Sequence, residues 1–283
     1  MPTATARSHL SKCAVPGSCN SAFPAFAHGV GALGSAAMTA RSLPIPPSLG
    51  SLLDRAPHAL FLDFDGTLVE IAPAPDAIDV APNLSEKLVA LSQRLDRRLA
   101  LVSGRSLDNL ADFLGLLPIA QAGSHGAHRV RADGSDLGKA PAPLDPATLD
   151  TLGSLAARHD ALLERKAHGA AIHFRSTPAS GDVIVEAARA IADDHALQVK
   201  SGKCVVELVR PGADKSSAVD AFLKIAPFAG AFPVFIGDDV TDEDGFVAAR
   251  RAGGFGIAVG ERASNAATYA LDSVADVHQW LGL

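Results

Sequence analysis

The chain has few cysteines and no long apolar run, and these absences argue against a disulfide-rich protein and a membrane-spanning protein. Only Cys13, Cys19 and Cys204 occur among its 283 residues, too few and too scattered for a disulfide framework or a cysteine metal site. This scarcity favours a reducing compartment such as the cytoplasm. No uninterrupted apolar stretch approaches the roughly 20 residues that a membrane-spanning helix needs. We therefore expect a soluble protein without a membrane partner.

Blocks of positive charge are also missing. The formal net charge is −6, and Lys and Arg are spread through the sequence rather than clustered. Nucleic acids and anionic membrane surfaces are bound by basic clusters, so neither is expected as a partner. The composition instead favours a small soluble substrate, and we expect the protein to act as a monomer.

Residues 1–53 contain no acidic residue and are rich in Ala, Ser, Pro and Gly, a composition that predicts no packed structure. Two explanations fit this leader. With Arg7, Lys12 and Arg41 it has the basic, acid-poor character of a targeting segment. Alternatively the start codon is assigned too early and Met38 is the true start, which is the explanation we prefer.

The remainder alternates short apolar runs with helical patterns, which is typical of βαβ units and a parallel sheet. Runs at 59–62, 99–102 and 234–236 are too short for helices and predict buried strands. Leucines at helical spacing over 84–95 predict a crossover helix. The expected class is therefore α/β, with a Rossmann-like sheet that binds ligands at the carboxyl ends of its strands.

The middle of the chain has a different texture and predicts a smaller α/β cap domain. We expect the cap to span residues 128–210, inserted into a catalytic core made of 54–127 and 211–283. The cap pattern predicts strands at 162–166, 171–175 and 203–209, a loop containing Gly169 and a helix at 182–192.

Asp63-Phe64-Asp65-Gly66-Thr67-Leu68 follows the first predicted strand directly. Two carboxylates one residue apart point to the same side of an extended segment, so Asp63 and Asp65 can face one phosphate. The alternative is an ordinary strand that ends in an Asp-Gly turn.

Three further polar segments occur at comparable places. Ser103 ends the second predicted strand, where its hydroxyl serves either a phosphate oxygen or a helix N-cap. Lys215 precedes a helical pattern, where its cation would neutralise Asp63 and a phosphate together. The segment 237–243 contains four carboxylates, Asp238, Asp239, Asp242 and Glu243, which repel one another unless a cation or solvent compensates them.

A hard divalent cation fits such an oxygen-rich segment, and Mg2+ takes a few carboxylates while keeping several waters. Asp63, Asp238 and the backbone carbonyl of Asp65 would suffice as its protein ligands. Asp239 and Asp242 are better placed to support that site from behind.

In this order, the four motifs resemble those of the haloacid dehalogenase phosphatases over about residues 58–283. The resemblance implies that Asp63 is the nucleophile and that Asp65 is the general acid and base. It further implies that Ser103 and Lys215 hold the phosphoryl oxygens and that Mg2+ is the cofactor. The insertion between the second and third motifs corresponds to the second class of cap in that superfamily.

Within the cap, Glu164-Arg165-Lys166, Ile172-His173-Phe174-Arg175 and Gly202-Lys203-Cys204-Val205-Val206-Glu207 resemble the signature of trehalose-6-phosphate phosphatases, as do Ser103-Gly104-Arg105 and Gly123-Ser124-His125-Gly126. This resemblance implies a substrate site on the cap and at two core loops. Its expected residues are Arg105, His125, Glu164, Lys166, Arg175, Lys203 and Glu207. A structural role for His125 is an equal alternative.

The implied reaction is hydrolysis of trehalose 6-phosphate to trehalose and phosphate through an aspartyl-phosphate. Three alternatives stay open: a phosphatase of another sugar phosphate such as sucrose 6-phosphate, a sugar phosphomutase that returns the phosphoryl group to a sugar, and a non-catalytic sugar-phosphate sensor. Net release of phosphate separates the first from the other two.

Overall fold

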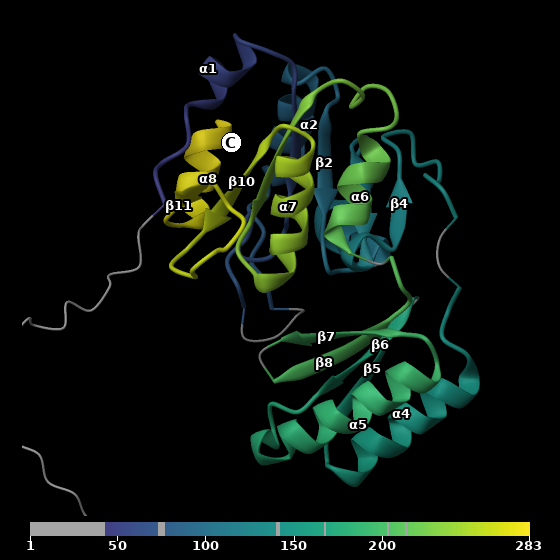
Figure 1. Ribbon diagram of the computed structural model, residues 1–283. Coiled ribbons are helices and arrows are strands. Elements are labelled where there is room, and N and C mark those ends of the chain that lie inside the picture. The colour runs from purple at the N-terminus through teal and green to yellow at the C-terminus, as the bar shows by residue number, and fades with distance from the viewer. Residues whose placement is uncertain (1–42, 73–76, 140–141, 167, 203, 213) are drawn as a thin grey trace, which may run out of the picture. The chain divides into compact units, whose positions relative to one another are not determined.

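Two sheets organise the computed structural model, which describes residues 43–72, 77–139, 142–166, 168–202, 204–212 and 214–283. The larger sheet has the strand order β11-β10-β9-β1-β2-β3-β4 (Figure 1). All its pairings are parallel except that of β4 with β3. Its strands are β1 (His58–Leu62), β2 (Leu99–Val102), β3 (Ala120–Gly123), β4 (His128–Val130), β9 (Phe232–Gly237), β10 (Phe255–Val259) and β11 (Tyr269–Leu271).

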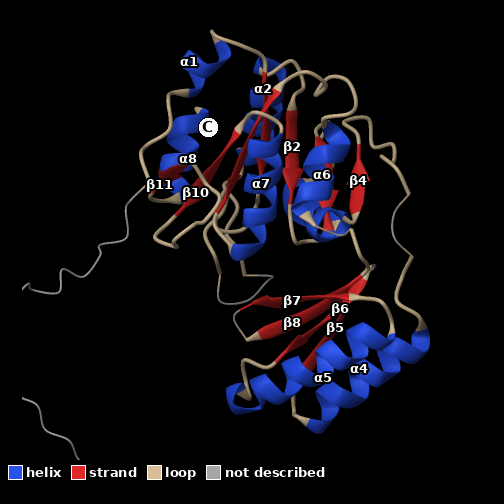
Figure 2. Cartoon of the chain, in the orientation of Figure 1, coloured by secondary structure: helices blue, strands red, loops and turns tan. Residues whose placement is uncertain are grey.

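Helices cover both faces of this sheet, as Figure 2 shows in blue. They are α1 (Leu49–Leu53), α2 (Leu84–Arg94), α3 (Leu107–Leu114), α6 (Lys215–Phe222), α7 (Glu243–Arg251) and α8 (Val274–Leu281). Leu60 and Leu62 pack with residues of α2, α3 and α8, whereas Ala59 and Phe61 pack with α6 and α7. Strand side chains alternate between faces, so a strand covered on both sides is apolar throughout, which explains the short apolar runs of the sequence.

The smaller sheet is antiparallel with the order β5-β6-β8-β7. Its strands are β5 (Leu162–Lys166), β6 (Gly169–His173), β7 (Gln198–Gly202) and β8 (Val205–Val209), and its helices are α4 (Pro146–Arg158) and α5 (Gly181–Asp194). Ile172, Val206 and Leu208 pack with residues of both helices, so the helices cover one face. Because side chains alternate, the opposite face carries the charged residues of the cap.

The expected α/β class, with a parallel core sheet and a smaller α/β cap, is confirmed. Residues His128–Val130, expected in the cap, instead form β4, which pairs with β3 of the core sheet. The register of the second cap strand differs from the expectation. Gly169, expected in a loop, opens β6 and pairs with Lys166 and Val209. A Cβ at Gly169 would lie 2.7 Å from the carbonyl oxygen of Leu208, so only glycine fits against β8 there. Arg175, expected on the strand, lies in the turn after β6.

The expectation that residues 1–53 form no packed structure is wrong for 43–53, while 1–42 lie outside the described residues. Leu49 and Leu52 are buried in α1. The carbonyl of Pro47 accepts a hydrogen bond of 2.8 Å from the indole of Trp280. The carbonyl of Pro44 likewise accepts a hydrogen bond of 3.0 Å from the backbone N–H of Ala270 in β11. The partners Ala270 and Trp280 lie 226 and 233 residues further along the chain, so local composition does not reveal these contacts.

Replacing Leu49 by Ala tests this packing. Leu49 is 3% exposed within the main apolar cluster, so Leu49→Ala should lower the free energy of unfolding by about 2–5 kcal/mol. Ile45→Ala is the matched control, because Ile45 is 80% exposed and should change stability by less than about 0.5 kcal/mol. Urea unfolding measures both, and equal effects would contradict the packed segment.

Candidate active site

Three polar residues follow three neighbouring strands of the core sheet. Asp63 comes directly after β1, Ser103 after β2 and Asp238 after β9, and these strands are adjacent in the order β9-β1-β2. Because the strands run in parallel, their carboxyl ends share one edge. The structure thus brings the first, second and fourth motifs together.

Lys215, the first residue of α6, places the third motif at the same edge. Its ammonium lies 2.9 Å from Oδ1 of Asp63 and 2.6 Å from Oδ1 of Asp242, and the side chains of Lys215 and Asp242 are 2% and 0% exposed. Burial alone lowers the pKa of Lys215, but the charges of Asp242 and Asp63 outweigh it and raise the pKa. The lysine is therefore a permanent cation that compensates two buried carboxylates.

Asp63, Asp238 and Asp242 offer carboxylate oxygens that all lie within 4.8 Å of one another. When all three are ionised, they carry three negative charges against the one positive charge of Lys215. Burial and the neighbouring Asp242 raise the pKa of Asp63, and the same causes raise the pKa of Asp238 to about 7. The remaining charge of about −2 is what a divalent cation would neutralise.

The donors at the three carboxylates separate their roles. Oδ1 of Asp242 accepts from Lys215, and its Oδ2 accepts from the backbone N–H of Asp239 at 2.9 Å. Oδ1 of Asp238 is buried and has no hydrogen-bond partner among the described residues. Asp238 is therefore suited to bind a metal ion that prefers oxygen ligands. Asp242 already accepts hydrogen bonds from Lys215 and from the backbone of Asp239.

Asp65 contacts the second motif. Its two carboxylate oxygens accept hydrogen bonds of 2.7 Å from Nε and Nη2 of Arg105. Arg105 also donates to Asn109 at 2.7 Å and lies over the ring of Phe113, 5.0 Å from its centroid. Such a bidentate pair has a defined geometry, so Asp65 has a fixed orientation here. Sequence spacing did not predict this pairing, because Arg105 was expected to contact substrate.

Ser103 is fully buried, and its hydroxyl oxygen accepts a hydrogen bond of 3.1 Å from the backbone N–H of Arg105. It is not the N-cap of the next helix, since Ser106 has that role in α3. The hydroxyl of Ser103 thus shapes the loop after β2 at the edge where Asp63 lies.

His125 joins this edge to the cap. Its backbone is left-handed, with φ 56°, and its Nε2–H donates to Oε2 of Glu207 in β8 at 3.1 Å. Burial lowers the pKa of His125, although the Glu207 contact acts in the opposite direction. The contact at neutral pH is therefore a hydrogen bond from a neutral imidazole, and Nδ1 of His125 is buried without a partner in the described part of the chain.

Glu207 has a second partner from the cap, Lys166 in β5, at 3.0 Å. Lys166 and Glu207 lie on strands on either side of β6. Ala171 of β6 pairs with Glu207 on one side and on the other with Glu164, which is two residues before Lys166 on β5. Two strand spacings amount to about 10 Å, which long side chains bridge only where the intervening one is small. Burial alone raises the pKa of Glu207, but the His125 hydrogen bond and the Lys166 charge lower it to about 2.

The other three residues expected at the sugar site of the cap are Glu164, Arg175 and Lys203. Glu164 accepts a hydrogen bond of 2.8 Å from Nε2 of His173, across the hairpin. Arg175 is exposed in the turn after β6. Lys203 lies outside the described residues.

Lys200 was missed by the sequence argument. It pairs with Glu207 across β7 and β8 and therefore shares the charged face of the cap. Burial lowers the pKa of Lys200, while the carboxylates of Glu207, Asp214 and Asp244 act against that shift. The alternation of Gln198, Lys200 and Gly202 was the available signal, but it became informative only once β7 was placed beside β8.

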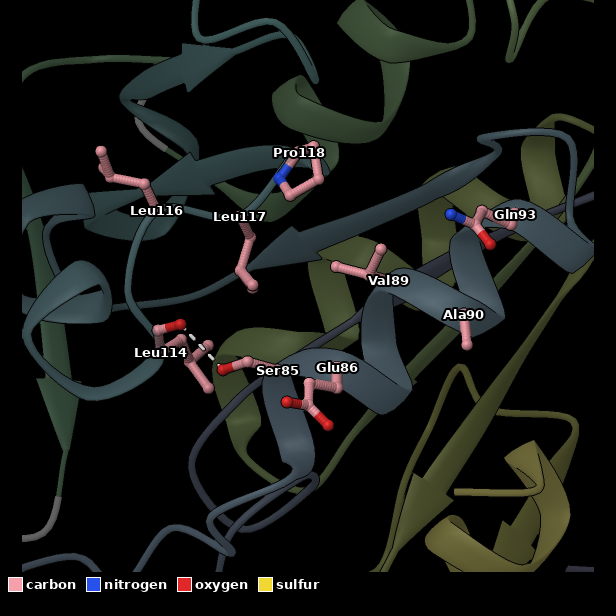
Figure 3. A pocket seen from close by; sticks show the side chains of 9 residues that line it. All are labelled: Ser85, Glu86, Val89, Ala90, Gln93, Leu114, Leu116, Leu117 and Pro118. Atoms are coloured by element: carbon pink, nitrogen blue, oxygen red, sulfur yellow. Dashed lines mark hydrogen bonds between the residues drawn. The ribbon is translucent and has the colours of Figure 1, made fainter.

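A cavity of about 450 Å3 lies elsewhere, between α2 and the segment that joins α3 to β3 (Figure 3). Six of its nine lining residues are apolar, and the hydroxyl of Ser85 donates to the carbonyl oxygen of Leu114 at 2.8 Å. None of the residues that line it belongs to the acidic edge described above. The lining residues are Ser85, Glu86, Val89, Ala90, Gln93, Leu114, Leu116, Leu117 and Pro118.

Comparison with known proteins identifies the family. The trehalose-phosphatase family model matches residues 61–275. The chain belongs to the trehalose-phosphatase family. It is 37% identical over 229 residues to the trehalose-6-phosphate phosphatase of Escherichia coli, which covers 80% of this chain and 86% of that protein. A probable trehalose-phosphate phosphatase of Sinorhizobium fredii is 39% identical over 214 residues, or 71% and 77% of the two chains.

Solved structures agree with this fold. The C-terminal domain of a Candida albicans trehalose-6-phosphate phosphatase has a TM-score of 0.68 and 22% identity, and the match covers 85% of this chain and 98% of that one. A Bacteroides thetaiotaomicron phosphatase of the haloacid dehalogenase superfamily has a TM-score of 0.56. At 22% and 16% identity these two structures show a shared fold. The family model and the two relatives confirm the resemblance to trehalose-6-phosphate phosphatases, and the protein is a phosphatase. Among the described residues of this trehalose-phosphatase family member, no helix has the length and apolar character needed to cross a membrane.

The acidity of Glu207 predicts a pH dependence. Its folded-state pKa of about 2 lies below the ordinary value of 4.5, so its stabilising contribution is complete above about pH 5 and is lost as the pH falls towards 2. At 1.36 kcal/mol per pKa unit the contribution is about 3 kcal/mol. Glu207→Gln should remove that part of the pH dependence.

Urea unfolding between pH 2.5 and 6 measures it. The free-energy difference between the wild type and Glu207→Gln should shrink as the pH falls. Glu186→Gln, at an exposed position of α5, is the control and should stay parallel to the wild type. A constant difference for Glu207→Gln would contradict the assigned acidity.

Proposed function

We propose that the protein hydrolyses trehalose 6-phosphate to trehalose and phosphate, with Asp63 as nucleophile. Membership of the trehalose-phosphatase family supports this substrate. The observation that carries the proposal is the His125–Glu207 hydrogen bond. It connects the charged face of the cap to the core edge that holds Asp63. One sugar phosphate can therefore place its sugar on the cap and its phosphate at that edge.

The chemistry follows from the acidic pair. An oxygen of Asp63 attacks phosphorus, the bond from phosphorus to the sugar oxygen breaks, and Asp65 gives that oxygen a proton. Water then attacks the phosphorus of the aspartyl-phosphate and loses a proton to Asp65, which releases phosphate and restores Asp63. Because both oxygens of Asp65 accept from Arg105, Asp65 exchanges this partner for the sugar oxygen before it donates.

Lys215 and Ser103 hold the phosphoryl oxygens in this proposal. Lys215 is the only buried cation at the edge among the described residues, and its charge opposes the repulsion between Asp63 and an incoming phosphate. Asp63, Asp238 and the backbone carbonyl of Asp65 would hold Mg2+, with Asp239 and Asp242 supporting the loop. When bound, Mg2+ supplies charge neutralisation and orients the phosphate.

Sugar recognition falls to the cap and to His125. Carboxylates accept from sugar hydroxyls, whereas Lys and Arg donate to them, and the charged face of the cap has both kinds. Glu164, Lys166, Arg175, Lys203 and Glu207 are the proposed contacts. In the structure Glu207 forms an ion pair with Lys166, so we propose that substrate hydroxyls replace existing protein contacts. A monomer in the cytoplasm is the proposed setting.

A phosphate-release assay over a panel of sugar phosphates tests the substrate. We expect trehalose 6-phosphate to have the highest kcat/KM, with dependence on Mg2+. A preference for sucrose 6-phosphate would move the assignment to another sugar-phosphate phosphatase. Transfer of the phosphoryl group to a sugar without phosphate release would instead indicate a phosphomutase.

Two amide substitutions separate nucleophile from acid. Asp63→Asn should abolish turnover, because an amide does not attack phosphorus. Asp65→Asn should slow turnover by at least about 10²–10⁴-fold, the range that general acid–base catalysis contributes. Steady-state kinetics measures both, with circular dichroism as the control for folding. Near-normal phosphate release by folded Asp63→Asn would exclude the mechanism.

Substitutions in the cap should affect substrates unequally. Lys166→Ala and Lys203→Ala should reduce kcat/KM on trehalose 6-phosphate by about ten- to 150-fold, since a hydrogen bond to a charged group contributes about 1.5–3 kcal/mol. Activity on a small aryl phosphate should change little, because its phosphate reaches Asp63 without using the cap.

Arg165→Ala is the matched control. Arg165 lies between Glu164 and Lys166 on β5, exposed and directed to the other face. It should leave both activities unchanged. The Lys166 and Lys203 variants could instead lose equal activity on both substrates with folding intact. That result would show that these residues do not bind the sugar.

A further inference from the structure

Arg262, in the loop between β10 and β11, binds the backbone of the acidic loop. Its Nε donates to the carbonyl oxygen of Asp238 at 2.9 Å, and its Nη2 donates to the carbonyl oxygen of Asp239 at 3.0 Å. These are successive carbonyls of the segment that follows β9. One planar guanidinium therefore fixes the two peptide groups that flank the α-carbon of Asp239, the first of which joins Asp238 to Asp239.

Glu243 anchors the same guanidinium from the start of α7. Its Oε1 accepts from Nη2 of Arg262 at 2.8 Å, while its Oε2 accepts from the backbone N–H of Ala266 at 2.9 Å and of Asn265 at 3.2 Å. Arg262 itself also donates to the carbonyl of Ala263 at 2.9 Å. The loop after β10 and the acidic loop are thus tied together by hydrogen bonds at both ends of the Arg262–Glu243 pair.

Asp238 needs such a restraint because little holds its side chain. Its Oδ1 has no hydrogen-bond partner among the described residues, and the carboxylates of Asp63 and Asp242 repel it. Gly66 lies so close that a Cβ there would be 2.2 Å from Oδ2 of Asp238. Packing against Gly66 therefore confines Oδ2, while no hydrogen bond fixes Oδ1, so the direction of the carboxylate also depends on the Asp238 backbone, which Arg262 binds.

We propose that Arg262 is a positioning residue that orients Asp238 towards a divalent cation at the acidic edge, with Glu243 holding Arg262 in place. The inference rests on the Mg2+ dependence in the proposed function. Arg262 contacts no reacting atom; it acts through the backbone of a metal ligand. Supporting residues of this kind contribute about 10–100-fold to metal affinity in proteins.

The test is Mg2+ binding measured apart from catalysis. Thermal unfolding of the wild type, Arg262→Ala and Arg262→Lys is followed as Mg2+ is increased. The Mg2+ concentration that gives a fixed rise in Tm, called the Mg2+ midpoint, scales with the dissociation constant and so reports affinity. We expect Arg262→Ala to shift that midpoint to about ten-fold higher Mg2+ or more. Arg262→Lys should recover only part, because a lysine lacks the fork that binds two carbonyls.

Arg251→Ala is the matched control. Arg251 is an exposed arginine in the last turn of α7 that pairs with Asp220 at 2.6 Å, and its loss should leave the midpoint unchanged. The same titration of phosphate release should show activity returning at high Mg2+ in Arg262→Ala. This separates weakened Mg2+ binding from a general loss of structure.

The outcomes are distinguishable. A Mg2+ midpoint for Arg262→Ala within about two-fold of that for Arg251→Ala would overturn the positioning role. If Arg262→Ala fails to fold, the midpoint of Arg262→Lys decides, and a value equal to the wild type would overturn it as well. A wild type whose Tm and activity ignore Mg2+ would instead overturn the metal dependence of the proposed function, and the inference with it.

Discussion

One ammonium group between two carboxylates is the contact on which the catalytic edge depends. Lys215 of α6 reaches Asp63 after β1 and Asp242 after β9, so three distant parts of the chain meet at a buried cation. Breaking such a network leaves an uncompensated buried charge and is strongly destabilising. The same contact sets the chemistry, because it keeps Asp63 beside a permanent positive charge and leaves Asp238 in need of a second one.

The charged face of the cap depends on a different feature, the small side chains of β6. Small residues in β6, such as Ala171, allow Lys166 and Glu207 to meet across the central strand. Glu207 then accepts from His125 of the core. Before substrate binds, the ion pair with Lys166 keeps the Glu207 carboxylate in place and compensates its charge. Sugar hydroxyls can donate to and accept from the same groups.

Much of this arrangement was predictable from short-range patterns. The apolar runs marked β1, β2 and β9 because strands covered on both faces must be apolar, and the polar residues that end them marked the edge. Long-range contacts were not predictable. Arg105 pairs with Asp65, residues 43–53 pack near Trp280, and Arg262 binds the Asp238 backbone only because the fold brings them together. Gly169 was misplaced because its close neighbour, Leu208, belongs to a strand 39 residues later.

Chemical denaturation of Lys215→Met tests the central contact most directly. Removing the ammonium should lower the free energy of unfolding by about 3–5 kcal/mol, the cost of stranding a buried charge. Adding Asp242→Asn to Lys215→Met should recover part of that loss, because one of the two stranded carboxylates disappears. A loss below about 1 kcal/mol in Lys215→Met, or a double variant less stable than the single one, would contradict charge compensation by Lys215.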